Sequence, residues 1–153
     1  MRKVVATIAT LCFVATASGI PAKAAGPREK IRNIVHQVKA YCSTHTLEEC
    51  KRAVSPDGQF GVKKLGENYA FILRDDGVMI AHGANARFVG KNFSMLRDPT
   101  GKLLVKAMVS AGKKGGGYIP YKWVHPVTKK LADKIAYCEA FKDKYVICAG
   151  AYE

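Results

Sequence analysis

The sequence predicts an α+β domain built around an antiparallel sheet. Apolar residues recur at helical spacing from Arg28 onward, and a tight-turn signal occurs at Asp75-Asp76-Gly77. Between residues 115 and 153, three runs rich in aromatic and β-branched residues are separated by turn residues, which is typical of an antiparallel meander. The predicted order is therefore helix, two strands, a loop and a helix, and three strands.

The first 24 residues have the features of a secretory signal peptide. Met1-Arg2-Lys3 is positively charged, Val4 to Ile20 carries no charge, and Ala22-Lys23-Ala24 has the small-x-small form of a cleavage site. A retained membrane anchor is the alternative, but the apolar stretch has 17 residues, whereas a spanning helix needs roughly 20. We expect cleavage before Ala25 and a periplasmic or secreted protein.

The mature chain, residues 25–153, is long enough for one domain and too short for two. Cleavage removes three of the 25 Lys and Arg residues and none of the 12 Asp and Glu residues, which leaves 22 against 12 and a net charge of +10. Such a charge favours anionic partners. The basic residues are scattered, with no run of five, so we expect a solvated surface and no nucleic-acid partner.

Two helices are expected at the start of the mature chain. The first begins near Arg28 and has one apolar face, made by Ile31, Ile34, Val35, Val38, Tyr41 and Cys42. Thr46 followed by Glu49 has the form of a capping box, which predicts a second helix from Leu47 to about Ala53.

A hairpin and a third helix follow. Residues 69–74 and 78–82 read as strands joined by a turn that needs positive φ. From Gly83 to Pro99 we expect a loop with at most a short helical turn. Apolar residues at helical spacing predict a helix over residues 102–111, with Gly112 placed to stop it.

The mature chain has four cysteines, and an even number in a small exported protein indicates two disulfides. If Lys142 to Lys144 forms the last hairpin loop, Cys138 faces Cys148 directly, which allows a bridge after modest adjustment. Cys42 and Cys50 then remain as a local pair. A four-thiolate zinc site is the alternative, but the chain lacks the Cys-x-x-Cys spacing.

A series of motifs in this order resembles the single Cache domains, extracytoplasmic sensor modules related to the PAS-like fold. The resemblance covers roughly Arg28 to Tyr152. Its motifs are Tyr69-Ala-Phe-Ile-Leu-Arg-Asp-Asp-Gly-Val-Met-Ile-Ala-His82, Val89-Gly-Lys-Asn92, Asp98-Pro-Thr-Gly-Lys102, Gly116-Gly-Tyr118, Tyr121-Lys-Trp123, Lys134-Ile-Ala-Tyr137 and Ala149-Gly-Ala-Tyr152.

The resemblance implies a long N-terminal helix packed on a central antiparallel sheet of five to six strands, with a small ligand pocket on the other face. Related domains bind short carboxylates such as acetate, propionate, lactate or pyruvate. They usually belong to membrane chemoreceptors or histidine kinases, and commonly dimerise through the N-terminal helix. This sequence stops at Glu153 without a second spanning helix or an output domain. We therefore expect a free periplasmic binding protein; the alternative is a regulatory module that contacts a membrane sensor without ligand.

The meander offers the first candidates for the pocket. Tyr121 and Trp123 share one face of a strand and suit a pocket wall, although core packing of the pair is the alternative. Lys134 is the best candidate for pairing a carboxylate, because a covered ammonium needs an anionic partner; the alternative is an exposed lysine at a strand end. Tyr137 could donate a hydrogen bond, but a regular strand points it away from Lys134, so either a bulge intervenes or one of the two assignments is wrong.

Further candidates lie in the first hairpin and in the loop after it. His82 could stand at the pocket mouth, and Arg87 on the lid could bind a carboxylate in a bidentate manner. The remaining wall candidates are Tyr69, Phe71 and Tyr118, followed by Phe93 and Met95. No phosphate loop, nucleophile elbow or metal-binding helix motif occurs, so we expect neither an enzyme nor a cofactor.

Overall fold

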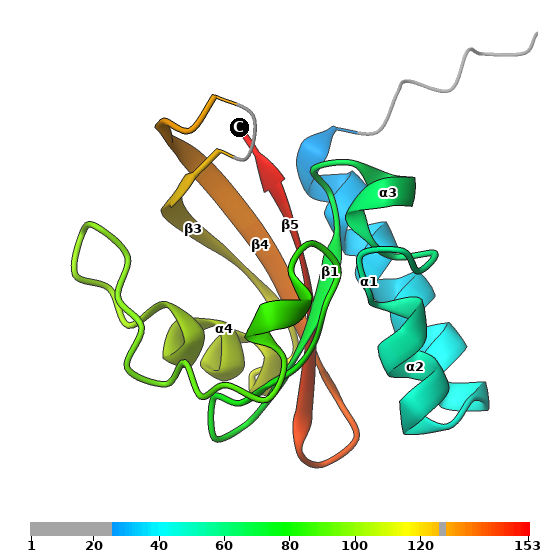
Figure 1. Ribbon diagram of the computed structural model, residues 1–153. Coiled ribbons are helices and arrows are strands. Elements are labelled where there is room, and N and C mark those ends of the chain that lie inside the picture. The colour runs from blue at the N-terminus through cyan, green and yellow to red at the C-terminus, as the bar shows by residue number, and fades with distance from the viewer. Residues whose placement is uncertain (1–25, 126–127) are drawn as a thin grey trace, which may run out of the picture.

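The computed structural model describes residues 26–125 and 128–153, in which helices cover both faces of a five-stranded antiparallel sheet (Figure 1). The expected signal peptide, residues 1–24, lies outside the described part. The strand order is β2-β1-β5-β4-β3. The strands are β1 (Ala70–Arg74), β2 (Met79–His82), β3 (Gly117–Val124), β4 (Leu131–Phe141) and β5 (Tyr145–Tyr152). The predicted α+β fold with five to six strands is confirmed.

The long helix α1 (Pro27–Thr44) packs across β5 and β4. Pro27 occupies its first turn, where a missing backbone N–H costs nothing. The helix buries five of the predicted apolar residues, namely Ile31, Ile34, Val35, Val38 and Cys42, and leaves Tyr41 partly buried. Fully burying an isoleucine or valine contributes about 1.5–3 kcal/mol, so this stripe fixes the helix on the sheet.

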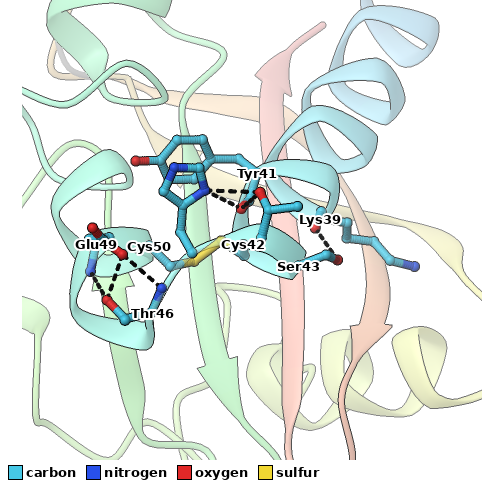
Figure 2. The surroundings of a disulfide bond; sticks show 9 residues. Lys39, Tyr41, Cys42, Ser43, Thr46, Glu49 and Cys50 are labelled. Atoms are coloured by element: carbon cyan, nitrogen blue, oxygen red, sulfur yellow. Dashed lines mark hydrogen bonds between the residues drawn. A yellow bond between two sulfur atoms is a disulfide. The ribbon is translucent and has the colours of Figure 1, made fainter.

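The helix α2 (Leu47–Ala53) begins with the predicted capping box, shown in Figure 2. The Thr46 hydroxyl accepts from the Glu49 N–H at 3.3 Å, and the Glu49 carboxylate accepts from the Thr46 N–H at 2.8 Å. The predicted disulfide between Cys42 and Cys50 is present and ties α2 to the end of α1. The single-turn helix α3 (Val62–Leu65) was not predicted, because four residues give no readable periodicity.

Both predicted hairpin turns are confirmed. The Arg74 N–H donates to the Val78 carbonyl, and Gly77 has φ 92°. In the last hairpin, Phe141 pairs with Tyr145. Cys138 faces Cys148 with their Cα atoms 4.1 Å apart, and the predicted disulfide joins them.

The helix α4 (Leu104–Lys113) corrects one expectation, since Gly112 does not end it. The helix ends at Lys113, and the chain turns away from it at Gly115, which has φ 101°. Gly112 instead allows close packing on β5, because a Cβ there would lie 2.5 Å from Cγ1 of Val146. The loop before α4 contains only the expected short turn, the 3₁₀ helix η1 (Ala86–Phe88).

The sheet has a core on each face. Helices α1, α2 and α3 lie on one side, while α4 and the loop before it lie on the other (Figure 1). Alternation along each strand divides the side chains, so that Ile72, Ile135 and Ile147 face α1, whereas Phe71, Leu73 and Val146 face α4. Within residues 26–125 and 128–153, no helix combines the length and hydrophobicity that crossing a membrane requires.

Candidate functional site

A cavity of about 300 Å³ lies on the α4 side of the sheet. Its walls come from β1, β2, β3, η1, α4 and the loop between η1 and α4. The lining is aromatic and aliphatic: Tyr69, Phe71, Leu73, Met79, His82, Phe88, Phe93, Leu96, Leu104, Val105, Met108, Tyr121 and Trp123. No acidic side chain is among them. Such a cavity suits a small ligand that is largely apolar and carries no positive charge.

Lys134 lies in the middle of β4 and is 1% exposed. Its ammonium donates to the Tyr69 hydroxyl at 2.8 Å and lies 4.4 Å and 4.6 Å from the ring centroids of Tyr69 and Tyr152. Among the described residues, no carboxylate forms an ion pair with it. Burial lowers the pKa of Lys134 to about 7, and the more distant charge of Glu67 opposes this shift. Lys134 is not itself a lining residue and reaches the cavity through the Tyr69 hydroxyl.

Gly150 provides the space for this ammonium. It lies on β5, the neighbouring strand, and a Cβ added there would be 2.9 Å from Cε and 3.5 Å from Nζ of Lys134. Any side chain at position 150 would therefore push the ammonium away from its present place.

His82 is a neutral hydrogen-bond donor on the cavity wall. Its Nδ1 accepts from the backbone N–H groups of Ala84 and Asn85, at 3.1 Å and 3.0 Å, so the ring proton of the neutral form is on Nε2. Burial, together with the charge of Lys134, lowers the pKa of His82 to about 4. Nε2 has no hydrogen-bond partner within the part of the chain that the structure describes.

Tyr69 and Tyr121 add two hydroxyl groups. Burial raises the pKa of both phenols, so both stay protonated at neutral pH. The Tyr69 oxygen accepts from Lys134, which leaves its own proton free to donate. Tyr121 pairs with Lys134 across β3 and β4, and the ring of Trp123 lies beside it with the centroids 6.2 Å apart.

Of the nine predicted ligand-binding residues, five line the cavity: Tyr69, Phe71, His82, Tyr121 and Trp123. Lys134 contacts one of these lining residues. The structure therefore brings six of the nine together at one place, from four strands.

The structure does not bring Tyr118 and Tyr137 to this cavity, and predicting them as pocket residues was wrong. Strand β4 keeps an unbroken register with both neighbours, so no bulge turns Tyr137 toward Lys134. Both side chains point to the α1 side. The Tyr118 hydroxyl donates to the Arg28 carbonyl, and the Tyr137 hydroxyl donates to Glu139 at 2.6 Å.

Arg87 is also absent from the cavity wall. It lies in η1 with an exposed side chain, and the neighbouring Phe88 fills the wall position. Of the two lesser candidates, Phe93 lines the cavity and Met95 is 67% exposed.

Two groups of site residues were missed by sequence reasoning. Leu73, Met79, Leu96 and the α4 residues Leu104, Val105 and Met108 are ordinary apolar side chains with no signal of their own. Tyr152, in contrast, could have been found from the register of the last hairpin. If Cys138 faces Cys148, then Lys134, four residues earlier, faces Tyr152, four residues later.

Comparisons with known proteins agree with this fold. A sensor histidine kinase, MctS of Rhizobium johnstonii, is 32% identical over 87 residues, which are 56% of this chain and 19% of the kinase. The chain thus corresponds to about a fifth of that relative.

Two solved structures share the architecture at low sequence identity. A methyl-accepting chemotaxis protein from Vibrio parahaemolyticus has a TM-score of 0.67 at 20% identity, covering 82% of this chain and 87% of its own. A Cache chemosensory domain studied for carboxylic acid recognition has a TM-score of 0.66 at 22% identity, covering 81% and 91%. The family model of the Cache domain matches residues 58–153, which include every strand and the whole lining of the cavity. The chain belongs to the Cache domain family.

Proposed function

We propose that this protein is an exported binding protein whose cavity holds a short monocarboxylate. The observation that carries the proposal is Lys134, a buried ammonium without a carboxylate partner among the described residues, next to a mostly apolar cavity. A buried cation is costly unless an anion compensates its charge. A ligand carboxylate in the cavity supplies that charge.

The polar groups of the site favour a carboxylate head. Tyr69, Tyr121 and His82 each present a donor, and Lys134 adds positive charge behind Tyr69. Hydrogen bonds to charged groups contribute about 1.5–3 kcal/mol each, which is enough to orient a small anion.

The apolar walls favour a ligand whose part beyond the carboxylate is a short aliphatic chain. The lining offers no carboxylate for the ammonium group of an amino acid. Acetate, propionate, lactate and pyruvate are the candidates, with propionate ahead of lactate because a buried hydroxyl without a partner lowers affinity.

Titration calorimetry of residues 25–153 against these four acids tests the proposal. We expect binding of at least one acid, and a loss of roughly tenfold or more in affinity for Lys134→Met, from removing a charge-assisted contact. Lys122→Met is the matched control, because Lys122 lies on β3 and forms an exposed ion pair with Asp133 on β4. Absence of binding by the wild-type protein, or equal binding by Lys134→Met, would contradict the proposal.

The location and the partner are further parts of the proposal. The signal-peptide pattern supports export, and the likeness to part of a sensor histidine kinase supports a membrane sensor, a kinase or a chemoreceptor, as the partner that reads the ligand state. Self-association through α1 would use its exposed polar face. The alternative, a ligand-independent module with a degenerate pocket, would need side chains to fill the cavity, and its volume of about 300 Å³ argues against that.

A further inference from the structure

We propose that the cavity takes up a proton together with the carboxylate, and that Lys134 is the group that receives it. This inference rests on the proposed function and specifies how binding is regulated. The proton comes from the solvent and goes to the amine Nζ, the ligand remains a carboxylate, and the site gains a neutral ion pair.

Among the residues that the structure describes, no anion pairs with Lys134 to hold its proton in the free protein. The groups that face it are Tyr69 before β1, Tyr121 on β3, Tyr152 on β5 and His82 on β2. All of these are neutral at pH 7, since burial raises the pKa of each phenol and lowers that of His82.

The carboxylate of Glu67 acts on Lys134 through its charge, but it pairs with another residue. Its Oε1 lies 3.0 Å from Nε2 of His125, and the His125 ring packs on Tyr152 with the centroids 4.6 Å apart. The aromatic ring of Tyr152 covers Lys134 on this side. Glu67 therefore favours the charged form of Lys134 without forming an ion pair with it.

The balance of these effects leaves the amine near its midpoint at neutral pH. Burial lowers the pKa of Lys134 from 10.5 to about 7, so a substantial part of the molecules carries a neutral amine at neutral pH. A carboxylate bound at the Tyr69 hydroxyl adds the missing opposite charge, which raises the pKa of the amine. Binding then draws a proton from solvent into the remaining molecules.

The coupling makes affinity depend on pH. Between the pKa of the free protein and the higher pKa of the complex, linkage predicts a loss of about tenfold in affinity per pH unit. Below pH 6 the amine is already charged, so affinity levels off. The protein then responds to acid load as well as to carboxylate concentration.

Calorimetry with propionate at pH 8, in buffers of different protonation enthalpy, measures the proton count. We expect uptake of a substantial fraction of one proton per ligand for the wild-type chain at pH 8 and a smaller uptake at pH 6, because the neutral fraction of the amine in the free protein grows as the pH rises above its pKa. Lys134→Arg, which stays charged, should bind without uptake. Lys122→Met should match the wild type in both affinity and uptake.

The outcomes separate the two proposals. Wild-type binding without uptake overturns the proton coupling and leaves the binding function in place. Uptake that persists in Lys134→Arg also overturns it, because the proton then goes to a group other than Lys134. Failure of acetate, propionate, lactate and pyruvate to bind overturns both.

A measurement on the unmodified protein covers the case in which Lys134→Arg does not fold. The ¹³Cε shift of Lys134 is followed against pH, with and without saturating propionate. We expect a titration midpoint near 7 in the free protein and a midpoint at least one unit higher in the complex. An unchanged midpoint overturns the inference.

Discussion

Gly150 controls the position of the Lys134 ammonium, so it offers a test that leaves the lysine in place. In Gly150→Ala, the added methyl group would meet Cε at 2.9 Å and displace the ammonium from Tyr69. Losing a hydrogen bond of this kind costs about 1.5–3 kcal/mol, so we expect monocarboxylate affinity to fall roughly tenfold or more by calorimetry.

Gly117→Ala is the matched control for that substitution. Gly117 lies at the start of β3, has no positive φ, and its added Cβ would meet only the Cβ of Ala111 at 3.4 Å. Its affinity should equal that of the wild type. Equal affinities for the wild type and Gly150→Ala would mean that the contact between Lys134 and Tyr69 does not contribute to binding.

At the scale of elements, one carboxylate joins α1 to β4. Glu139 accepts from Nζ of Lys39 at 2.6 Å, from Nε2 of His36 at 2.8 Å and from the Tyr137 hydroxyl. Burial raises the pKa of Glu139, but these three hydrogen bonds outweigh it and hold the pKa at about 2. The interaction therefore stabilises the docking of α1 above pH 4.5, and its contribution is lost as the pH falls toward 2.

We expect Glu139→Gln to lower the free energy of unfolding at pH 7 by about 1–3 kcal/mol, measured by urea denaturation. The variant should also lose less stability than the wild type between pH 4.5 and pH 2. Glu29→Gln is the control, because Glu29 is an exposed residue in the first turn of the same helix. A wild-type acid profile in Glu139→Gln would refute this role.

Element order and side-chain direction could be predicted because they depend on local patterns. Tyr121 and Trp123 could be predicted since period-two alternation places them on one face, and Lys134 because a covered ammonium needs an anionic partner. The same alternation already set Tyr137 on the opposite face from Lys134, and the unbroken register of β4 shows that no bulge reverses it. Arg87 could not be resolved in this way, because loop direction depends on tertiary contacts. The cavity itself depends on how α4 and the loop pack, and spacing does not encode that.

At the scale of the whole molecule, we expect the exported protein to begin at Ala25. Small residues at positions 22 and 24 define the cleavage site, so Ala24→Arg should block processing and retain residues 1–24. Lys23→Arg changes only the unconstrained middle position and should be processed normally. Intact-mass spectrometry of the exported protein distinguishes the two, and a wild-type mass that includes residues 1–24 would support the membrane anchor instead.

The strand order sets when the sheet can assemble. β5 is the last strand in the sequence, yet it occupies the centre of the sheet, between β1 and β4. The hairpins β1–β2 and β3–β4 have no direct pairing with each other, so neither half of the sheet can join the other before β5 is available. A chain emerging gradually from a ribosome or a translocation channel therefore cannot complete this sheet early. Until its C-terminal segment arrives, only the two separate hairpins can pair, and the continuous sheet with its two cores has to wait for the last strand.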